Sequence, residues 1–158
     1  MQLRRATMDD ALDVLSWRND ETTRMNSFTQ DEISKESHLK WFKKKLDDDN
    51  CLMYILEDKN VKAGSIRVDI TDDVGEISYM IAPYERGRGL GKGIIELLET
   101  MPEIVSNDNR KQIRCLVGFV NEDNIASAKC FKGNGYTELN AGNIKCYIKT
   151  MTDRVFME

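Results

Sequence analysis

The sequence of 158 residues predicts an α+β fold with one mixed sheet. Short apolar segments between residues 51 and 81 are typical of a strand meander. Helical periodicity appears on both sides of this meander, and two further strand segments close the chain. The predicted order is therefore β-α-α-β-β-β-α-β-α-β-β. No repeat or low-complexity segment interrupts this order, so residues 1–158 are expected to form a single domain.

The N-terminal elements precede the meander. They are a strand over residues 2–5, a helix over 7–19, a polar loop over 20–30 and a second helix that ends before residues 47–50. Thr7 is the expected N-cap of the first helix, because acidic residues follow it in the first turn. Two starts are open for the second helix: a capping box that begins at Thr29, or a start after Ser34.

The remaining elements alternate between strands and helices. They are strands over residues 51–57, 61–71 and 75–81, a helix from about residue 90, a strand over 113–120, a helix over 124–132, and a hairpin over 136–139 and 144–150. Alternating Ile66, Val68 and Ile70 indicate that the second strand of the meander is buried on one face. The sequence Gly-Asn-Gly at residues 133–135 is typical of a helix C-cap.

Composition excludes several classes of function. A formal net charge of −4 without a concentrated basic face argues against a nucleic-acid partner. The single histidine and four widely spaced cysteines argue against a metal site. The chain has no signal-peptide core and no apolar run of membrane-spanning length, so we expect no membrane partner and a cytoplasmic protein with reduced thiols. The sequence leaves open whether the protein is a monomer or a homodimer.

The most informative segment joins a strand to a helix between Tyr79 and Glu99 and has the sequence YMIAPYERGRGLGKGIIELLE. Such a glycine-rich turn leaves backbone N–H groups pointing at one spot. The positive end of the helix dipole then favours a phosphate or pyrophosphate there. The register excludes a Walker loop, because Arg86 stands five residues before Gly91, and no glycine begins the dinucleotide motif G-x-G-x-x-G.

The loop does fit the pattern R-x-x-G-x-G, formed by Arg86, Gly89 and Gly91. This pattern resembles the acyl-CoA signature of the GNAT superfamily of N-acetyltransferases, in which the loop holds the CoA pyrophosphate. The resemblance implies acetyl-CoA as co-substrate. It also implies a GNAT-like mixed, mostly antiparallel sheet of about seven strands flanked by about four helices. Within the segment from Tyr79 to Glu99, the residues expected to bind the cofactor are Tyr79, Met80, Ile81, Arg86, Gly87, Arg88, Gly89, Leu90, Gly91 and Lys92.

A second motif of the same superfamily, N-x-x-A-x-x-x-Y-x-x-x-G-F, resembles residues 124–136. Asn124 and Gly135 match, Ser127 stands for the small residue, and Tyr136 replaces the final Phe. The resemblance adds Asn124 and Phe131 to the expected cofactor-binding residues. Phe131 stands where many relatives carry a tyrosine thought to protonate the CoA thiolate, and a phenyl ring has no proton to give.

Acetyl transfer requires a neutral amine and a polarised thioester carbonyl. Glu76 is the candidate catalytic base, because it lies on the strand before the loop, where many relatives carry a catalytic glutamate. Alternation places it on one face with Ser78 and Met80. The alternative is an exposed strand glutamate without a catalytic task. By analogy with the family, a backbone N–H within residues 79–81 polarises the carbonyl.

The amine acceptor is expected at the first two helices. The sequence Trp-Arg-Asn at residues 17–19 resembles the start of the acceptor region in a GNAT branch that acts on nucleotide-linked 4-amino sugars. The residues expected to bind the acceptor are Trp17, Arg18, Asn19, His38 and Trp41. Aromatic faces suit a sugar or a uracil, and arginine suits a phosphate. The alternatives are that these residues fill the core or pair at the surface, and that the acceptor is a polyamine or a protein amine. A non-catalytic acyl-CoA-binding module is a further alternative.

Overall fold

The computed structural model describes residues 1–105 and 113–151 of the chain. Seven strands form one sheet in the order β1-β2-β3-β4-β5-β7-β6. The strands are β1 (Gln2–Arg5), β2 (Cys51–Asp58), β3 (Val61–Thr71), β4 (Val74–Ile81), β5 (Cys115–Asn121), β6 (Thr137–Ala141) and β7 (Ile144–Thr150). Neighbouring strands are antiparallel except for the parallel pair β4 and β5. The predicted mixed, mostly antiparallel sheet is therefore confirmed.

Six α-helices occur in residues 1–105 and 113–151, where the sequence predicted about four. They are α1 (Ala11–Arg18), α2 (Glu21–Met25), α3 (Lys35–Leu46), α4 (Leu90–Leu98), α5 (Pro102–Val105) and α6 (Ile125–Gly133). The additional helices, α2 and α5, are too short to show an apolar period. Within the described ranges, no helix combines the length and the apolar character that a membrane span needs.

The prediction of a loop over residues 20–30 was wrong for its first part, which forms α2. The Asp20 carboxylate caps this helix by accepting a hydrogen bond from the Thr23 backbone N–H at 3.1 Å. Of the two predicted starts for the next helix, the start after Ser34 is confirmed. The Ser34 hydroxyl accepts a hydrogen bond from the Ser37 N–H at 3.2 Å, and α3 begins at Lys35.

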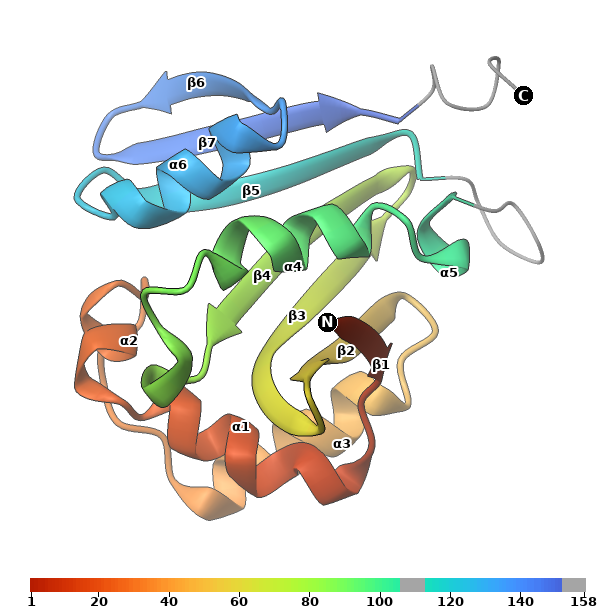
Figure 1. Cartoon of the computed structure of the whole chain (residues 1–158), viewed down its shortest axis with the longest axis vertical. Coiled ribbons are helices and arrows are strands. Elements are labelled where there is room, and N and C mark those ends of the chain that lie inside the picture. The colour runs from red at the N-terminus through yellow and green to blue at the C-terminus, as the bar shows by residue number, and fades with distance from the viewer. Residues whose placement is uncertain (106–112, 152–158) are drawn as a thin grey trace.

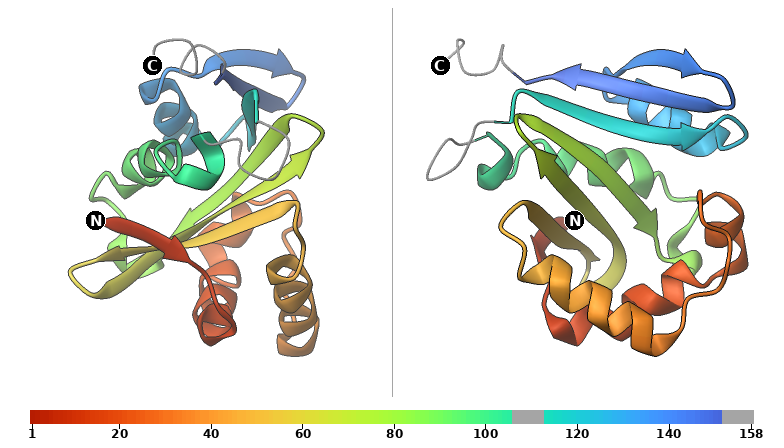
Figure 2. Two further views of the ribbon diagram at one scale, coloured as in Figure 1. Left: turned by 90° about the vertical axis from the view of Figure 1, so that its right-hand side faces the viewer. Right: turned by 180° about the vertical axis from the view of Figure 1, so that it is seen from behind.

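Helices cover both faces of the sheet (Figures 1 and 2). The helices α4 and α6 lie on one face, and α1 and α3 lie on the other. Each face has its own apolar core, and β2 contributes to both: Tyr54 packs toward α4, and Met53 packs toward α1 and α3. Burial on both faces explains why residues 51–56 are continuously apolar.

The parallel strands β4 and β5 pair only at one end. Val74–Ile77 pair with Cys115–Gly118, and the two strands then diverge, as Figure 1 shows. Residues 78–81 of β4 still pair with β3 on their other side. The divergence therefore leaves backbone groups of residues 78–81 without a strand partner on the β5 side, next to the glycine loop.

Candidate active site

A cavity of about 480 Å³ lies where β4 and β5 diverge. It is bordered by the glycine loop, α2 and the start of α6. Its lining residues are Thr22, Thr23, Asn26, Ser27, Tyr79, Met80, Ile81, Glu85, Arg86, Gly87, Gly89, Leu90, Gly91, Asn124, Ala126, Ser127 and Cys130. We call it the loop cavity. Most of the expected cofactor-binding residues meet here, and Arg88, Lys92 and Phe131 are not part of the lining.

The geometry of the glycine loop fits a bound anion. Gly87 and Gly89 have φ angles of +82° and +74°, which L side chains rarely adopt. Gly89 is the N-cap of α4, and a glycine has no side chain that could cap the first turn of this helix. An ideal Cβ at Gly87 or Gly89 would meet no atom within 4 Å, so the loop backbone is open toward solvent. A pyrophosphate can therefore approach the N–H groups at the positive end of α4.

The loop arginines are held by carboxylates from other elements. Arg86 donates to Asp20 Oδ2 at 2.6 Å and to Thr23 Oγ1 at 2.8 Å, which ties the loop to α2. Arg88 pairs with Asp58 and Glu85. Arg88 therefore points toward the β2–β3 turn, which explains its place outside the loop cavity.

On the other side of the loop cavity, Asn124 caps α6 by accepting a hydrogen bond from the Ser127 N–H at 3.2 Å. Phe131 is 2% exposed and stacks on Tyr147, with ring centroids 5.3 Å apart. Phe131 also packs so closely on β5 that a Cβ at Gly118 would lie 2.3 Å from its ring. Phe131 is therefore a core residue that shapes the site without lining it.

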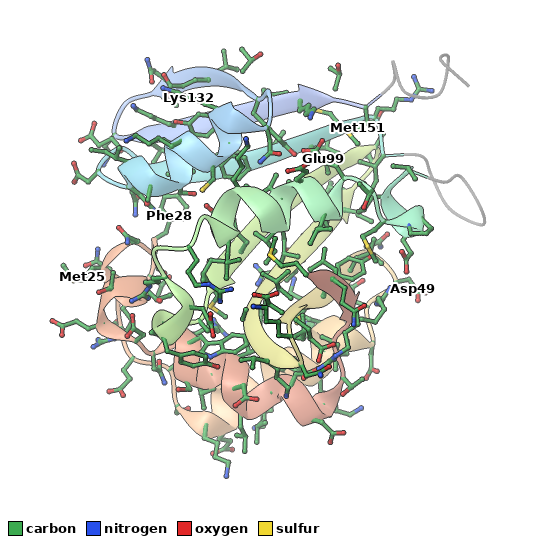
Figure 3. The ribbon with its side chains drawn as sticks, in the orientation of Figure 1. Met25, Phe28, Asp49, Glu99, Lys132 and Met151 are labelled. Atoms are coloured by element: carbon green, nitrogen blue, oxygen red, sulfur yellow. The ribbon has the colours of Figure 1, made fainter. Side chains whose placement is uncertain are left out.

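A second cavity, of about 540 Å³, lies on the opposite face of the sheet. We call it the helix cavity, because α1, α3 and the chain between them form its wall. Its lining residues are Val14, Arg18, Thr23, Ser27, Phe28, Thr29, Asp31, Ile33, Ser37, His38, Trp41, Met53, Ser65, Arg67, Ser78, Tyr79 and Met80. Phe28 is 58% exposed and lies beside α2 on the side toward α6 (Figure 3).

Arg18, His38 and Trp41, three of the expected acceptor residues, form a compact cluster in the helix cavity. The Arg18 guanidinium lies 4.2 Å from the centroid of the Trp41 ring, and its Nη1 donates to His38 Nδ1 at 3.0 Å. His38 Nε2 is 2.7 Å from the Ala11 carbonyl oxygen. An Nε2–H that donates to Ala11 leaves Nδ1 free to accept from Arg18, so His38 is neutral in this arrangement.

The electrostatics of this cluster favour a ligand with negative charge. Burial, and to a lesser extent the Arg18 charge, lower the pKa of His38, which keeps the ring neutral. Burial, and then the nearby Arg67 charge, lower the pKa of Arg18. No carboxylate of the described residues forms an ion pair with Arg18. A partly desolvated guanidinium without a carboxylate partner attracts an anion.

Arg67 is a cavity residue that the sequence did not suggest. Its guanidinium lies 5.0 Å from the Trp41 centroid, and it bonds to Asp69 at 2.8 Å and to Ser78 Oγ at 3.3 Å. Strand alternation already places Arg67 on the face opposite Ile66 and Val68. That signal alone could not show that α3 would bring a tryptophan over it.

The other two expected acceptor residues do not line the helix cavity. Trp17 is 2% exposed and packs in the core between α1, α3 and β2. The Asn19 side chain bridges the chain at Ile33, donating to its carbonyl oxygen and accepting from its N–H, both at 2.8 Å. Trp17 and Asn19 therefore stabilise the fold, and Arg18, which stands between them in the sequence, reaches the helix cavity.

Glu76 is exposed near the start of β4, and it does not line either cavity. The strand register keeps it on the face of Ser78 and Met80, which do line the helix cavity, and places it opposite Asp69 of β3. The carboxylate in the lining of the helix cavity is that of Asp31. Two carboxylates are therefore candidates for a base, and the role of Glu76 remains a prediction.

Sequence comparison agrees with these features. A family model described as an acetyltransferase (GNAT) domain matches residues 1–137. YfmK from Bacillus subtilis strain 168, named as an uncharacterised N-acetyltransferase, is 27% identical over 97 residues. This alignment covers 61% of the present chain and 62% of YfmK, so the chain matches about three fifths of that relative's length.

Solved structures share the fold. A domain from Methanocaldococcus jannaschii DSM 2661 has a TM-score of 0.77 at 22% identity, over 94% of this chain and 96% of its own. A spermidine N-acetyltransferase from Vibrio cholerae, solved in complex with CoA and spermine, has a TM-score of 0.83 at 15% identity, over 98% and 97% of the two chains. At such identities the likeness concerns the fold alone. The family match, which covers most of the chain, establishes that this protein belongs to the GNAT acetyltransferase domain family.

Proposed function

We propose that this protein is an acetyl-CoA-dependent N-acetyltransferase that transfers the acetyl group directly to a primary amine. Acetyl-CoA enters the loop cavity, with its pyrophosphate on the N–H groups between Gly87 and Gly91. The amine enters the helix cavity from the other face of the sheet. Both cavities are lined by Tyr79 and Met80, so the thioester and the amine meet beside this part of β4.

The transfer needs a proton acceptor and a polarised carbonyl. The amine nitrogen attacks the thioester carbon, the carbon–sulfur bond breaks, and the amine loses a proton. We propose Glu76 as the base, acting through water along the face that it shares with Ser78. Asp31 is the rival base, because it lines the helix cavity itself. Backbone N–H groups of residues 79–81 supply the polarisation, since β5 does not pair with them.

We propose that the acceptor is the 4-amino group of a nucleotide-linked sugar. The observation that supports this proposal is the Arg18 guanidinium, which lies on Trp41 without an ion-pair partner in the described part of the chain. Together with Arg67, it offers positive charge to a diphosphate. The Trp41 ring holds both guanidinium groups in the cavity. A polyamine would meet two guanidinium groups in this cavity, and only the Asp31 carboxylate of the lining would attract it.

We also propose that the protein acts in the cytoplasm, where acetyl-CoA and sugar nucleotides are available. All four cysteines are free thiols in the described structure. Burial raises the pKa of Cys51 to about 11, so this thiol stays protonated and unreactive. Free thiols are typical of a reducing compartment.

A competition assay tests the proposed acceptor. The protein is incubated with acetyl-CoA and equal concentrations of a UDP-linked 4-amino-4,6-dideoxyhexose, spermidine and a ribosomal-protein N-terminal peptide. We expect the sugar nucleotide to be acetylated first, and the same amino sugar without its nucleotide to react more slowly. Preference for spermidine or the peptide would refute the sugar acceptor and leave the transferase intact. Release of CoA no faster than hydrolysis with every amine would instead indicate an acyl-CoA-binding module.

A further inference from the structure

The loop cavity and the helix cavity meet at four shared residues. These residues are Thr23, Ser27, Tyr79 and Met80. A direct transfer brings the amine nitrogen into contact with the thioester carbon, so the reaction centre of the proposed function must lie at this junction. The sulfur that leaves as a thiolate is bonded to the same carbon and lies at the same place.

The negative charge on the departing sulfur needs a hydrogen-bond donor. Three of the four shared side chains have a hydroxyl group. The Thr23 hydroxyl accepts from Arg86 at 2.8 Å and lies 3.4 Å from the Asp20 carboxylate, which takes its proton. The Ser27 hydroxyl donates to the Thr23 carbonyl oxygen at 2.7 Å. Because each hydroxyl has one proton, Tyr79 is the side chain at the junction that can donate to a ligand.

The Tyr79 hydroxyl lies on the loop-cavity side of β4. It is 2.9 Å from Ser127 Oγ, and either oxygen can donate in this pair. It also lies 3.7 Å from the position that a Cβ at Gly91 would occupy, close to the start of α4. The ring packs edge-on against Phe131, with centroids 6.0 Å apart. The tyrosine hydroxyl is thus held at the base of the loop cavity by a serine and a buried aromatic ring.

The environment keeps this hydroxyl protonated. Burial raises the pKa of Tyr79 well above its ordinary value. When Ser127 donates to Tyr79, the phenolic proton faces the Cys130 thiol, which also lines the loop cavity. A thiol sulfur is a weak acceptor, so this proton can turn to a stronger acceptor bound in the cavity. Ser127 is itself fixed, because its backbone N–H donates to Asn124 at the start of α6.

We propose that the Tyr79 hydroxyl donates a hydrogen bond to the CoA sulfur as it leaves, and that Ser127 positions this hydroxyl. This inference rests on the proposed function, since it assigns a further catalytic residue to the same reaction. The carbon–sulfur electron pair goes to sulfur, the amine proton goes to the base, and the thiolate takes a proton from solvent on release. Phe131 cannot assist, because its ring is buried and has no donor.

The first experiment is the substitution Tyr79→Phe, which removes only the hydroxyl group. We expect kcat to fall by roughly 10²-fold, the scale for loss of one donor to a developing charge, while the Kd for acetyl-CoA stays within about threefold. The matched control is Tyr136→Phe. Tyr136 packs on the opposite side of Phe131, with centroids 5.1 Å apart, and lies outside both cavity linings. This control should retain kcat.

A second readout does not depend on the acceptor. CoA labelled with ¹³C beside the sulfur is bound to each protein, and its thiol is titrated by NMR. A donor to the thiolate lowers the thiol pKa, so the bound thiol in Tyr79→Phe should titrate about one unit higher than in the wild type. Tyr136→Phe should match the wild type. If no amine is acetylated, the proposed function fails, and this titration still tests Tyr79. An unchanged thiol pKa in Tyr79→Phe would overturn the assignment.

Discussion

The two cavities are built in different ways. The loop cavity presents backbone groups: Gly87 and Gly89 adopt positive φ angles, and the N-cap of α4 is a glycine, which has no side chain to cap the first turn. The helix cavity presents side chains from six helices and strands, including Arg18 from α1, Trp41 from α3 and Arg67 from β3. The difference shows that the loop cavity depends on backbone conformation, whereas the helix cavity depends on side chains that packing brings together.

The largest effect is expected from Gly89→Val, which tests whether the backbone of the loop cavity binds acetyl-CoA. A branched side chain at φ +74° is strained, and it would stand where the pyrophosphate approaches the N–H groups. We expect calorimetry to detect no acetyl-CoA binding, a loss of about 10²-fold or more. Gly91→Val should act similarly, because a Cβ there would lie 2.8 Å from Cys130 Sγ.

The control for Gly89→Val is Gly142→Val. Gly142 also has a positive φ, of +70°, and open space around it, but it lies in the β6–β7 turn. It suffers the same backbone strain outside the loop cavity, so acetyl-CoA affinity should stay at the wild-type level. Wild-type affinity in Gly89→Val itself would mean that the loop does not hold the cofactor.

Glu76→Gln tests which of the two carboxylates supplies the base. We expect kcat to fall by roughly 10²-fold, the usual scale for a general base, and the loss to shrink as pH rises and more free amine is present. The matched substitution Asp31→Asn should reduce kcat much less. A pH–rate profile of Glu76→Gln that follows the wild type, together with a large loss in Asp31→Asn, would transfer the role to Asp31.

Arg18→Ala tests whether the side chains of the helix cavity bind the acceptor. The KM for the UDP-linked amino sugar should rise by roughly tenfold or more, because a hydrogen-bonded charge contact is lost, while the KM for acetyl-CoA should not change. Lys40→Ala is the control, since Lys40 lies on α3 near Trp41 but pairs with Glu36 at the surface. Equal changes in both KM values would show that Arg18 supports the fold and not the acceptor.

The smallest effect is expected from Arg86→Ala. Arg86 is already paired with Asp20 and Thr23, and backbone groups supply most of the expected contacts to the pyrophosphate. We expect acetyl-CoA affinity to fall only about twofold to fivefold by calorimetry, the scale of a partly exposed ion contact. A loss as large as that of Gly89→Val would mean that side-chain charge, and not the backbone, dominates the loop cavity.

The contrast between the two cavities also explains how much of the fold and of the candidate site could be predicted from the sequence. The order of helices and strands along the chain and the glycine loop follow from local patterns, such as alternation in β3 and the glycines before α4. The helix cavity depends on packing between distant segments. Trp17 and Trp41 look equivalent in sequence, yet Trp17 is buried in the core and Trp41 lies under two guanidinium groups. The short helix α2 was not predicted because five residues show no apolar period.

The most direct test of the two-cavity account is a crystal structure with CoA and an acceptor or its acetylated product bound together. We predict the pyrophosphate on the N–H groups between Gly87 and Gly91, the sulfur beside the Tyr79 hydroxyl, and the acetylated nitrogen on the helix-cavity side of Met80. The acceptor's negative charge should contact Arg18. CoA outside the loop cavity, or an acceptor that reaches the sulfur without entering the helix cavity, would contradict the account.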